Sequence, residues 1–254
     1  MDIVFEGGGI KGLAYIGALR YLEERGLKIN NVAGTSVGSI FASLIAVGYT
    51  SSELQQLIDD LDFFEFWPKG KNIFKSTVGT IKNKALYSLT PLENKLEYLF
   101  SRKMKTKFKD IKVGNNYKLK VITTNVNSRK LVVIPNDLGK FNINGDDFPI
   151  SKAVCMSSAI PLVYQPYKIN NQIFVDGGIM SNFPMWLFKD KVNVFGFRLG
   201  KRKKNDGNNI IYIDTSRYRA TDFKKGFSER YYLYNLGYYY TKQFFDRYFE
   251  LLNI

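Results

Sequence analysis

A serine between two glycines, in the run Gly34-Thr35-Ser36-Val37-Gly38, joins a segment with the pattern of a strand to a segment with the pattern of a helix. Residues 31–33 are extended and apolar-leaning, and residues 39–47 are almost all apolar or small. A sharp strand-to-helix turn strains the backbone and packs against its neighbours, so it needs small flanking residues such as Gly34 and Gly38. The five residues alone are equally typical of an ordinary turn. The strand and helix around them favour an α/β fold with Ser36 as the nucleophile.

The chain of 254 residues contains no histidine. A Ser-His-Asp triad needs an imidazole to accept the serine proton, and most catalytic zinc sites use imidazole ligands. Neither arrangement can be built from this sequence. If Ser36 is a nucleophile, its base must be a carboxylate, a lysine or a tyrosinate. We expect no metal and no cofactor.

One aspartate is well placed to be that base. Asp176 follows the apolar run of residues 173–175 and precedes Gly177 and Gly178. An aspartate before two glycines often forms a turn with its own backbone. A doubly wound α/β protein would also place a catalytic carboxylate there, at the carboxyl edge of the sheet beside the ends of the first two strands.

A glycine-rich loop follows the first expected strand, residues 2–5, and opens a helix over about residues 13–24 that Gly26 ends. Its spacing, Gly7-x-Gly9-x-x-Gly12, is that of a dinucleotide fingerprint, but the second strand leads to Ser36 and not to an acidic residue. A Walker A loop fails as well, because Leu13 follows Gly12. A loop of this kind presents backbone N–H groups to an anion, and with the N–H of Val37 it could form an oxyanion hole. The loop residues are Gly7, Gly8, Gly9, Ile10, Lys11 and Gly12.

Other segments have clear periodicity. We expect helices over residues 51–61, capped by Ser51 or Ser52, over 90–103, beginning at Thr90-Pro91, over 149–159 and over 223–252. Strands are expected over residues 117–124 and 130–134, paired as a hairpin, and over 192–199 and 210–213. Residues 63–89 have an irregular pattern, typical of a surface loop pinned by its aromatics or of a lid over an apolar pocket.

The formal net charge is +14, which favours anionic partners. Residues 102–112 form a basic run that only Asp110 opposes, and we interpret it as a solvated face or, second, as a contact with an anionic bilayer. The lone Cys155 excludes an intrachain disulfide and has core neighbours. The N-terminus lacks a secretory pattern, and residues 37–49 are too short to span a bilayer. We expect a cytoplasmic protein, peripheral on membranes, and the sequence leaves export as an effector open as the alternative.

Three motifs occur in a fixed order: the glycine loop, the run around Ser36, and Asp176-Gly177-Gly178. Together with residues 153–161 and 174–184, they resemble the patatin-like phospholipases over about residues 1–184. The resemblance implies a three-layer α/β/α sandwich with a mostly parallel central sheet. We assign residues 1–199 to this domain and expect the basic turn, strand and aromatic helix of residues 200–254 to pack on it.

The resemblance also implies a reaction. Ser36 matches the nucleophile, Asp176 the general base and residues 7–12 the oxyanion hole, with Lys11 at the basic position of the loop. The implied enzyme is a phospholipase A that cleaves fatty-acyl esters through an acyl-enzyme, with no nucleic acid as partner and with oligomeric state left open. A carboxylesterase or acyltransferase, a phosphate-binding regulatory protein that uses residues 7–12, and a silent membrane module are the alternatives.

Overall fold

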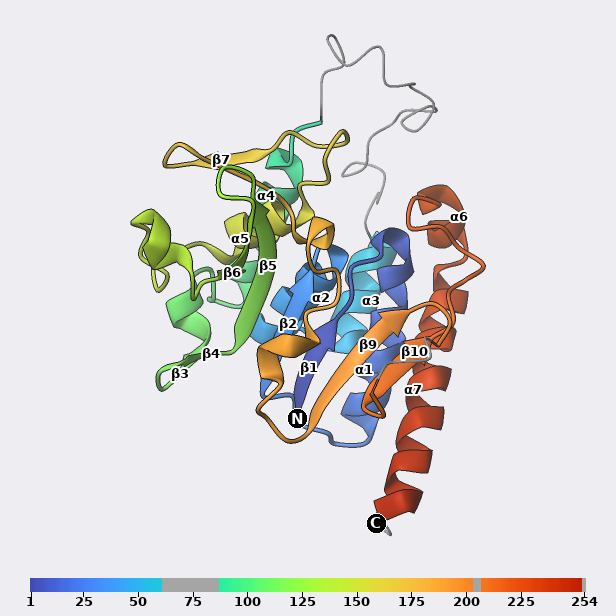
Figure 1. Ribbon diagram of the computed structural model, residues 1–254. Helices are drawn as coiled ribbons and strands as arrows, with labels where there is room; N and C mark the ends of the chain where they lie inside the picture. Colours follow the sequence, from blue (N-terminus) through green and yellow to red (C-terminus); the bar gives the residue numbers. More distant parts are fainter. Residues whose placement is uncertain (61–86, 203–206, 253–254) are drawn as a thin grey trace.

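The computed structural model describes residues 1–60, 87–202 and 207–252. These residues form a mixed sheet covered by helices, with α7 lying beside α1 and near the edge strand β10 (Figure 1). The helices are α1 (Ala14–Glu24), α2 (Val37–Val47), α3 (Ser51–Asp60), α4 (Thr90–Arg102), α5 (Ile150–Ser158), α6 (Phe223–Ser228) and α7 (Arg230–Leu252). The short 3-10 helices are η1 (Gly9–Leu13), η4 (Phe108–Ile111), η5 (Leu138–Phe141), η6 (Gly177–Ile179) and η7 (Met185–Phe188). Most of the segment 63–89 for which we considered a lid lies outside the described residues.

The strands of the main sheet follow the order β10-β9-β1-β2-β5-β8-β7, and β6 pairs with the free edge of β5. Strands β10, β9, β1, β2 and β5 are parallel, whereas β6, β7 and β8 run antiparallel to their neighbours. The bounds are β1 (Asp2–Phe5), β2 (Asn31–Thr35), β5 (Leu119–Asn125), β6 (Lys130–Ile134), β7 (Tyr167–Ile169), β8 (Gln172–Asp176), β9 (Val194–Leu199) and β10 (Ile210–Ile213), and a separate ribbon pairs β3 (Lys112–Val113) with β4 (Asn116–Tyr117). Five of the eight strands of this sheet are therefore parallel, as we expected, and the antiparallel strands β6, β7 and β8 lie on one side of β2.

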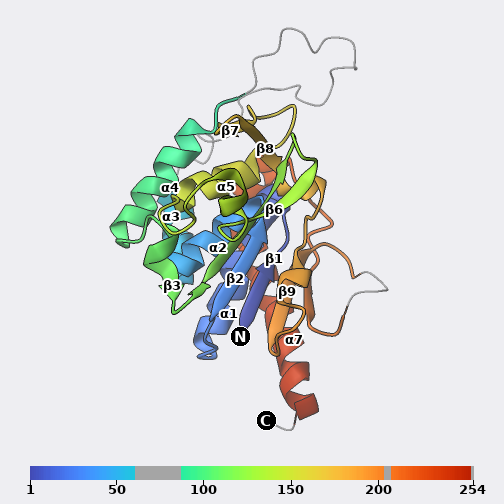
Figure 2. The ribbon, with the colours of Figure 1, turned by 60° about the vertical axis from the view of Figure 1, so that its left-hand side comes forward.

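The two faces of the sheet are covered unequally. Side chains of Ile3 and Phe5 on β1 belong to the large core under the helices, while Val4 packs with Phe188 of η7 in a small cluster on the other face. Figure 2 shows α2, α3, α4 and α5 gathered on one side of the strands. Because β1 is buried along its whole length, its residues after Asp2 form a continuous apolar run rather than an alternating one. The result is an α/β/α sandwich with one thick and one thin helical layer.

The C-terminal segment forms two helices and not the single one that we expected over residues 223–252. The helix α6 ends at Ser228, and α7 starts at Arg230 and packs along α1. Helices α1 and α7 cross at glycines. A Cβ on Gly17 of α1 would lie 1.8 Å from the carbonyl oxygen of Tyr234, and a Cβ on Gly237 of α7 would lie 1.7 Å from that of Ala14. Backbone contact of this kind is open only to glycine.

The start of α3 also differs from our expectation. Thr50 caps the helix, because its Oγ1 accepts a hydrogen bond from the N–H of Glu53 while the Glu53 carboxylate accepts one from the N–H of Thr50. This reciprocal pair is a capping box. Ser51, one of the two caps that we considered, instead donates its hydroxyl to Glu23 of α1. Among the described residues, no helix is both long and apolar enough to cross a membrane.

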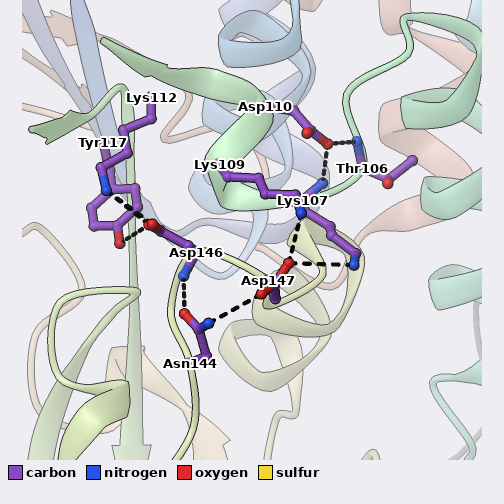
Figure 3. A network of polar contacts seen from close by, with 9 residues as sticks. All are labelled: Thr106, Lys107, Lys109, Asp110, Lys112, Tyr117, Asn144, Asp146 and Asp147. Carbon is purple, nitrogen blue, oxygen red and sulfur yellow. Dashed lines mark hydrogen bonds and ion pairs between the residues drawn. The ribbon is translucent and has the colours of Figure 1, made fainter. Parts of the chain in front are cut away.

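The basic run of residues 102–112 is largely paired. Asp147 bridges Lys107 and Lys109, at 3.6 Å and 2.7 Å, and Asp146 pairs with Lys112 at 3.0 Å, as Figure 3 shows. Lys103, from the same run, reaches Glu53 at 2.7 Å. These carboxylates come from residues outside the run, so the local sequence overstates the charge of this face.

We predict that Gly237→Ala destabilises the protein by roughly 1–3 kcal/mol, because the new methyl group forces α7 away from α1. Urea unfolding followed by circular dichroism measures the loss. Gly139→Ala is the matched control, since a Cβ at Gly139 would meet no atom within 4 Å. Equal stabilities of the two variants would show that the helices are not held together at this crossing.

Candidate active site

Two strands meet end to end along one edge of β5. Ile122 of β5 is opposite Thr35, the last residue of β2, and the next residue, Thr123, is opposite Asp176, the last residue of β8. The strand β6 occupies the other edge, so β2 and β8 share this one. Because β8 runs antiparallel to β5, the carboxyl ends of β2 and β8 point toward each other. Ser36 and Asp176 are therefore brought together, as we expected, but Asp176 arrives on an antiparallel strand and not on a parallel one.

Ser36 occupies the turn between β2 and α2 with a left-handed backbone, at φ 53° and ψ −129°. This conformation is uncommon for a residue with a side chain, and strain of this kind concentrates at functional sites. A hydrogen bond holds the turn: the N–H of Ser36 donates to the Ser157 hydroxyl at 2.8 Å, and that hydroxyl donates to the carbonyl of Ile122 at 2.6 Å. The α5 serine thus fixes the turn to β5.

The glycines that flank Ser36 are required by close backbone contact. A Cβ on Gly34 would lie 2.3 Å from the carbonyl oxygen of Gly38, and a Cβ on Gly38 would lie 2.4 Å from that of Phe5. Gly177 faces a similar contact, 2.4 Å from the carbonyl oxygen of Ile122. These contacts let α2 begin directly over the end of β1, as the spacing of the motif predicts.

The Asp176 carboxyl is buried, with 6% of its surface exposed. It accepts a hydrogen bond from the N–H of Gly178 at 2.6 Å, and the Ser36 side chain is close enough to affect its pKa. Burial raises the pKa of Asp176 to about 6, although the N–H of Gly178 and the Ser36 side chain act in the opposite direction. A carboxylate with a raised pKa in contact with a serine hydroxyl is suited to accept its proton.

The glycine loop lies over the same site, and its N–H groups have different partners. The N–H of Gly7 donates to the carbonyl of Asn182 at 3.0 Å, and the N–H of Ile10 donates to the carbonyl of Ala220 at 3.0 Å. Asn182 also donates its side-chain amide to the carbonyl of Gly7 at 2.9 Å. Gly7 and Ile10, which we included among the oxyanion donors, are thus already bonded.

The remaining candidates divide into two groups. The N–H groups of Gly8, Gly9 and Val37 have no acceptor within the part of the chain that the structure describes. Gly9 has a left-handed φ of +56°. Lys11 and Gly12 lie inside η1, where Gly12 packs so closely on Val37 that a Cβ would be 2.8 Å from the valine side chain. The geometry leaves Gly8, Gly9 and Val37 as the available donors.

An apolar cavity of about 160 Å³ opens beside Ser36. Most of its lining is aliphatic or aromatic and comes from η1, α2, α3, α4 and the start of α6, including Leu13, Phe41, Leu44, Leu57, Leu96, Leu99 and Phe223. The hydroxyl of Ser158, which also lines it, is buried and has no hydrogen-bond partner among the described residues. A larger groove of about 750 Å³ lies between α1, α3 and α7, but neither Ser36 nor Asp176 lines it.

Three residues of this site were absent from our sequence-based set. Ser157 and Asn182 belong to the segments 153–161 and 174–184 that carry the family resemblance, so their position in the motifs was an available signal. Ala220 follows the last family motif, and it contributes only a backbone carbonyl. A backbone acceptor can come from any residue, so no sequence pattern indicates this contact.

The sequence model of the family described as Patatin-like phospholipase matches residues 3–189. The chain belongs to the patatin-like phospholipase family. The resemblance that the three motifs indicated is therefore confirmed, and membership supports lipid hydrolysis as the class of activity. The match includes Ser36, Asp176 and the glycine loop but ends before β9.

Relatives of this patatin-like chain are known from bacteria and viruses. A protein of Bacillus subtilis (strain 168) called Uncharacterized protein YqhO is 36% identical over 214 residues, which cover 80% of this chain and 72% of the relative. A protein of Invertebrate iridescent virus 6 called Probable lipid hydrolase 463L is 27% identical over 184 residues, which cover 72% of this chain and 61% of the relative.

Two solved structures confirm the patatin-like fold. VipD from Legionella pneumophila matches 97% of this chain with a TM-score of 0.68 and 17% identity. ExoU of Pseudomonas aeruginosa, in its complex with SpcU, matches 97% with a TM-score of 0.61 and 18% identity. The chain spans 66% of the VipD chain and 51% of the ExoU chain.

We predict that Asp176 makes the stability of the fold fall as the pH rises from about 4 to about 6. A carboxyl has a pKa near 3.9 in the unfolded chain, and the folded value is about 6, so in this range only the native state keeps the proton. The expected loss is about 3 kcal/mol of unfolding free energy.

Urea unfolding of the wild type and of Asp176→Asn across this pH range measures the effect. The asparagine keeps an acceptor for the N–H of Gly178 and does not titrate, so the difference between the two proteins should change with pH. A constant difference would contradict a raised pKa.

Proposed function

We propose that this patatin-like protein is a phospholipase A that uses a dyad of Ser36 and Asp176. The observation that carries the proposal is that Ser36 and the buried Asp176 carboxyl are brought together at the shared edge of β5, beside an apolar cavity. In this reaction Asp176 accepts the hydroxyl proton as the Ser36 oxygen attacks the ester carbonyl. The tetrahedral intermediate collapses, the proton passes to the departing lysophospholipid oxygen, and Ser36 keeps the acyl group. Water, deprotonated by the same carboxylate, then releases the fatty acid.

The surroundings of Asp176 compensate for the weakness of a carboxylate as a base. A pKa of about 6 lies two units above that of a free aspartate, which favours proton transfer from serine. The cost is that the carboxyl must be ionised to act, so activity should depend on pH in the mildly acidic range.

The N–H groups of Gly8, Gly9 and Val37 are the oxyanion donors in this proposal. Val37 is the first residue of α2, so the positive end of the helix dipole also faces the intermediate. Removal of one oxyanion donor typically costs about 10²- to 10³-fold in rate. Backbone donors already held in place require no reorganisation during the reaction.

The substrate side of the proposal rests on the cavity. Its aliphatic lining matches a fatty-acyl chain, and Ser36 lies where the ester would enter. The name of the viral relative, Probable lipid hydrolase 463L, is consistent with a lipid ester. We propose a protein that works in the cytoplasm in peripheral contact with membranes. ExoU is described as a type III effector, which makes action in another cell the second hypothesis for location.

We predict that the wild type releases fatty acid from mixed phosphatidylcholine and phosphatidylserine vesicles and that Ser36→Ala and Asp176→Asn lose about 10³-fold or more of this activity. Ser52→Ala, which changes an exposed serine on α3, is the matched control and should keep full activity. Analysis of the products with and without an added alcohol separates hydrolysis from acyl transfer. Activity that persists in Ser36→Ala would contradict the assigned nucleophile.

The same assay should show a pH profile set by Asp176. Because only the ionised carboxylate acts as a base, kcat/KM should fall about tenfold per unit below a pKa near 6 and level off above it. A profile that stays flat between about pH 5 and pH 7 would show that Asp176 is not the base.

A further inference from the structure

Three loops meet at the carboxyl ends of the parallel strands, next to the catalytic pair. Residues 159–171 lie beside Asp176, because the carbonyl of Ala159 accepts the N–H of Asp176 at 2.9 Å. Residues 177–186 continue directly from Asp176. Residues 125–130 form the turn between β5 and β6, and the N–H of Val126 donates to Ile173 of β8 at 2.8 Å. We call these three segments the mouth face.

The mouth face exposes large apolar side chains. Leu162 is 75% exposed, Ile179 57% and Met180 50%. Ile160 and Tyr164, two residues before and after Leu162, line the apolar cavity, so Leu162 lies at its rim. Apolar surface around the entrance of an apolar cavity is typical of an interaction site.

The backbone of Leu162 adds a second observation. Its φ of 68° is left-handed, which is a strained conformation for a leucine. The side chain is nevertheless directed to solvent, where it contributes little to the folded core. The N–H groups of Val163 and Tyr164 both donate to the carbonyl of Ile160, so the turn holds Leu162 in this exposed position, which is consistent with a role in binding.

The charge of the mouth face is one-sided. None of its three segments contains an aspartate or a glutamate, while Arg129, Lys130 and Lys168 are exposed. Within the described parts of the chain these three cations have no carboxylate partner, in contrast to the paired lysines of Figure 3. The basic run at residues 102–112, in which we first considered a bilayer contact, is therefore the less suitable surface.

We propose that the mouth face docks on an anionic phospholipid bilayer, with Leu162, Ile179 and Met180 entering the acyl region and Arg129, Lys130 and Lys168 contacting the headgroups. An apolar centre with cationic flanks matches a bilayer interface better than it matches a nucleic acid, which offers no apolar phase. This proposal rests on the proposed function, because it names the surface through which the lipid substrate of that reaction enters the cavity.

The test is flotation of the full chain with vesicles of phosphatidylcholine, with or without phosphatidylserine. Ser36→Ala is the background for every variant, so that hydrolysis does not alter the vesicles. Leu162→Glu and Ile179→Glu probe the apolar centre, and the triple change of Arg129, Lys130 and Lys168 to Gln probes the cations. Val192→Glu is the matched apolar control, because Val192 is 88% exposed just before β9, at the opposite end of the parallel strands. Lys107→Gln with Lys109→Gln is the matched charge control.

We expect binding that requires phosphatidylserine and falls more than tenfold in Leu162→Glu. Loss of one bilayer-contacting cation should weaken binding roughly fivefold, so the triple change should abolish it. Both controls should bind like the background protein. Binding that none of the mouth variants changes, or that the Lys107 and Lys109 changes abolish, would overturn the proposal, as would a failure of the background protein to bind any vesicle.

A second readout separates this proposal from the proposed function. With Ser36 restored, Leu162→Glu should hydrolyse a monomeric short-chain ester at the wild-type rate but release little fatty acid from vesicles. If the wild type does not hydrolyse the soluble ester while flotation still depends on Leu162, the docking surface stands and the catalytic proposal fails. If Leu162→Glu loses both activities and its thermal unfolding is unchanged, Leu162 acts inside the active site and the docking role is wrong.

Discussion

The edge of β5 is the constraint on which this site depends. Two strands that run in opposite directions share that edge, and each ends where the other ends. Hydrogen-bond register along β5 thus sets the separation of Ser36 and Asp176 without any direct linkage between their strands. A slip of β8 by one residue would turn the Asp176 side chain to the opposite face of the sheet, because successive side chains alternate. The tight fit of Gly177 against Ile122 opposes such a slip.

Two features near the end of β2 and β8 are locally unfavourable for the stability of the fold. Ser36 has a strained backbone, and the Asp176 carboxyl is held away from water. Each cost is offset by a bond to a neighbouring element: Ser157 of α5 holds the serine turn, and the N–H of Gly178 holds the carboxylate. The glycines at the contacts of α1 with α7 and of α2 with β1 let the backbones pack directly against each other. Close backbone packing of this kind makes the elements around the site more rigid. Strain that is balanced in this way is characteristic of preorganised active sites.

Much of the candidate site could be predicted from the sequence because its key residues lie in short motifs with steric reasons of their own. Gly34 and Gly38 are required by backbone contacts, and the absence of histidine leaves few bases for Ser36. The direction of β8 could not be predicted, since a short apolar strand looks the same in either orientation. The pairing of Lys107 and Lys109 with Asp147 depends on a contact nearly 40 positions away in the chain, and local charge patterns contain no such information. The predicted cap of α3, Ser51 or Ser52, was one or two residues too late because Thr50, Ser51 and Ser52 are all good caps.

The carbonyl of Ala220 has a wider consequence. It accepts the N–H of Ile10 and lies so close to Gly9 that a Cβ there would be 2.1 Å away, although Ala220 lies beyond the residues that the family model matches. The part of the chain that the family model matches and the segment that follows it are therefore joined at the glycine loop beside Ser36. Without an acceptor at this position, the N–H of Ile10 would lose its partner and the loop would be held less tightly. The shape of the glycine loop therefore depends on a segment that contains none of the three motifs, and a change there alters the surroundings of Ser36 while every motif residue stays the same.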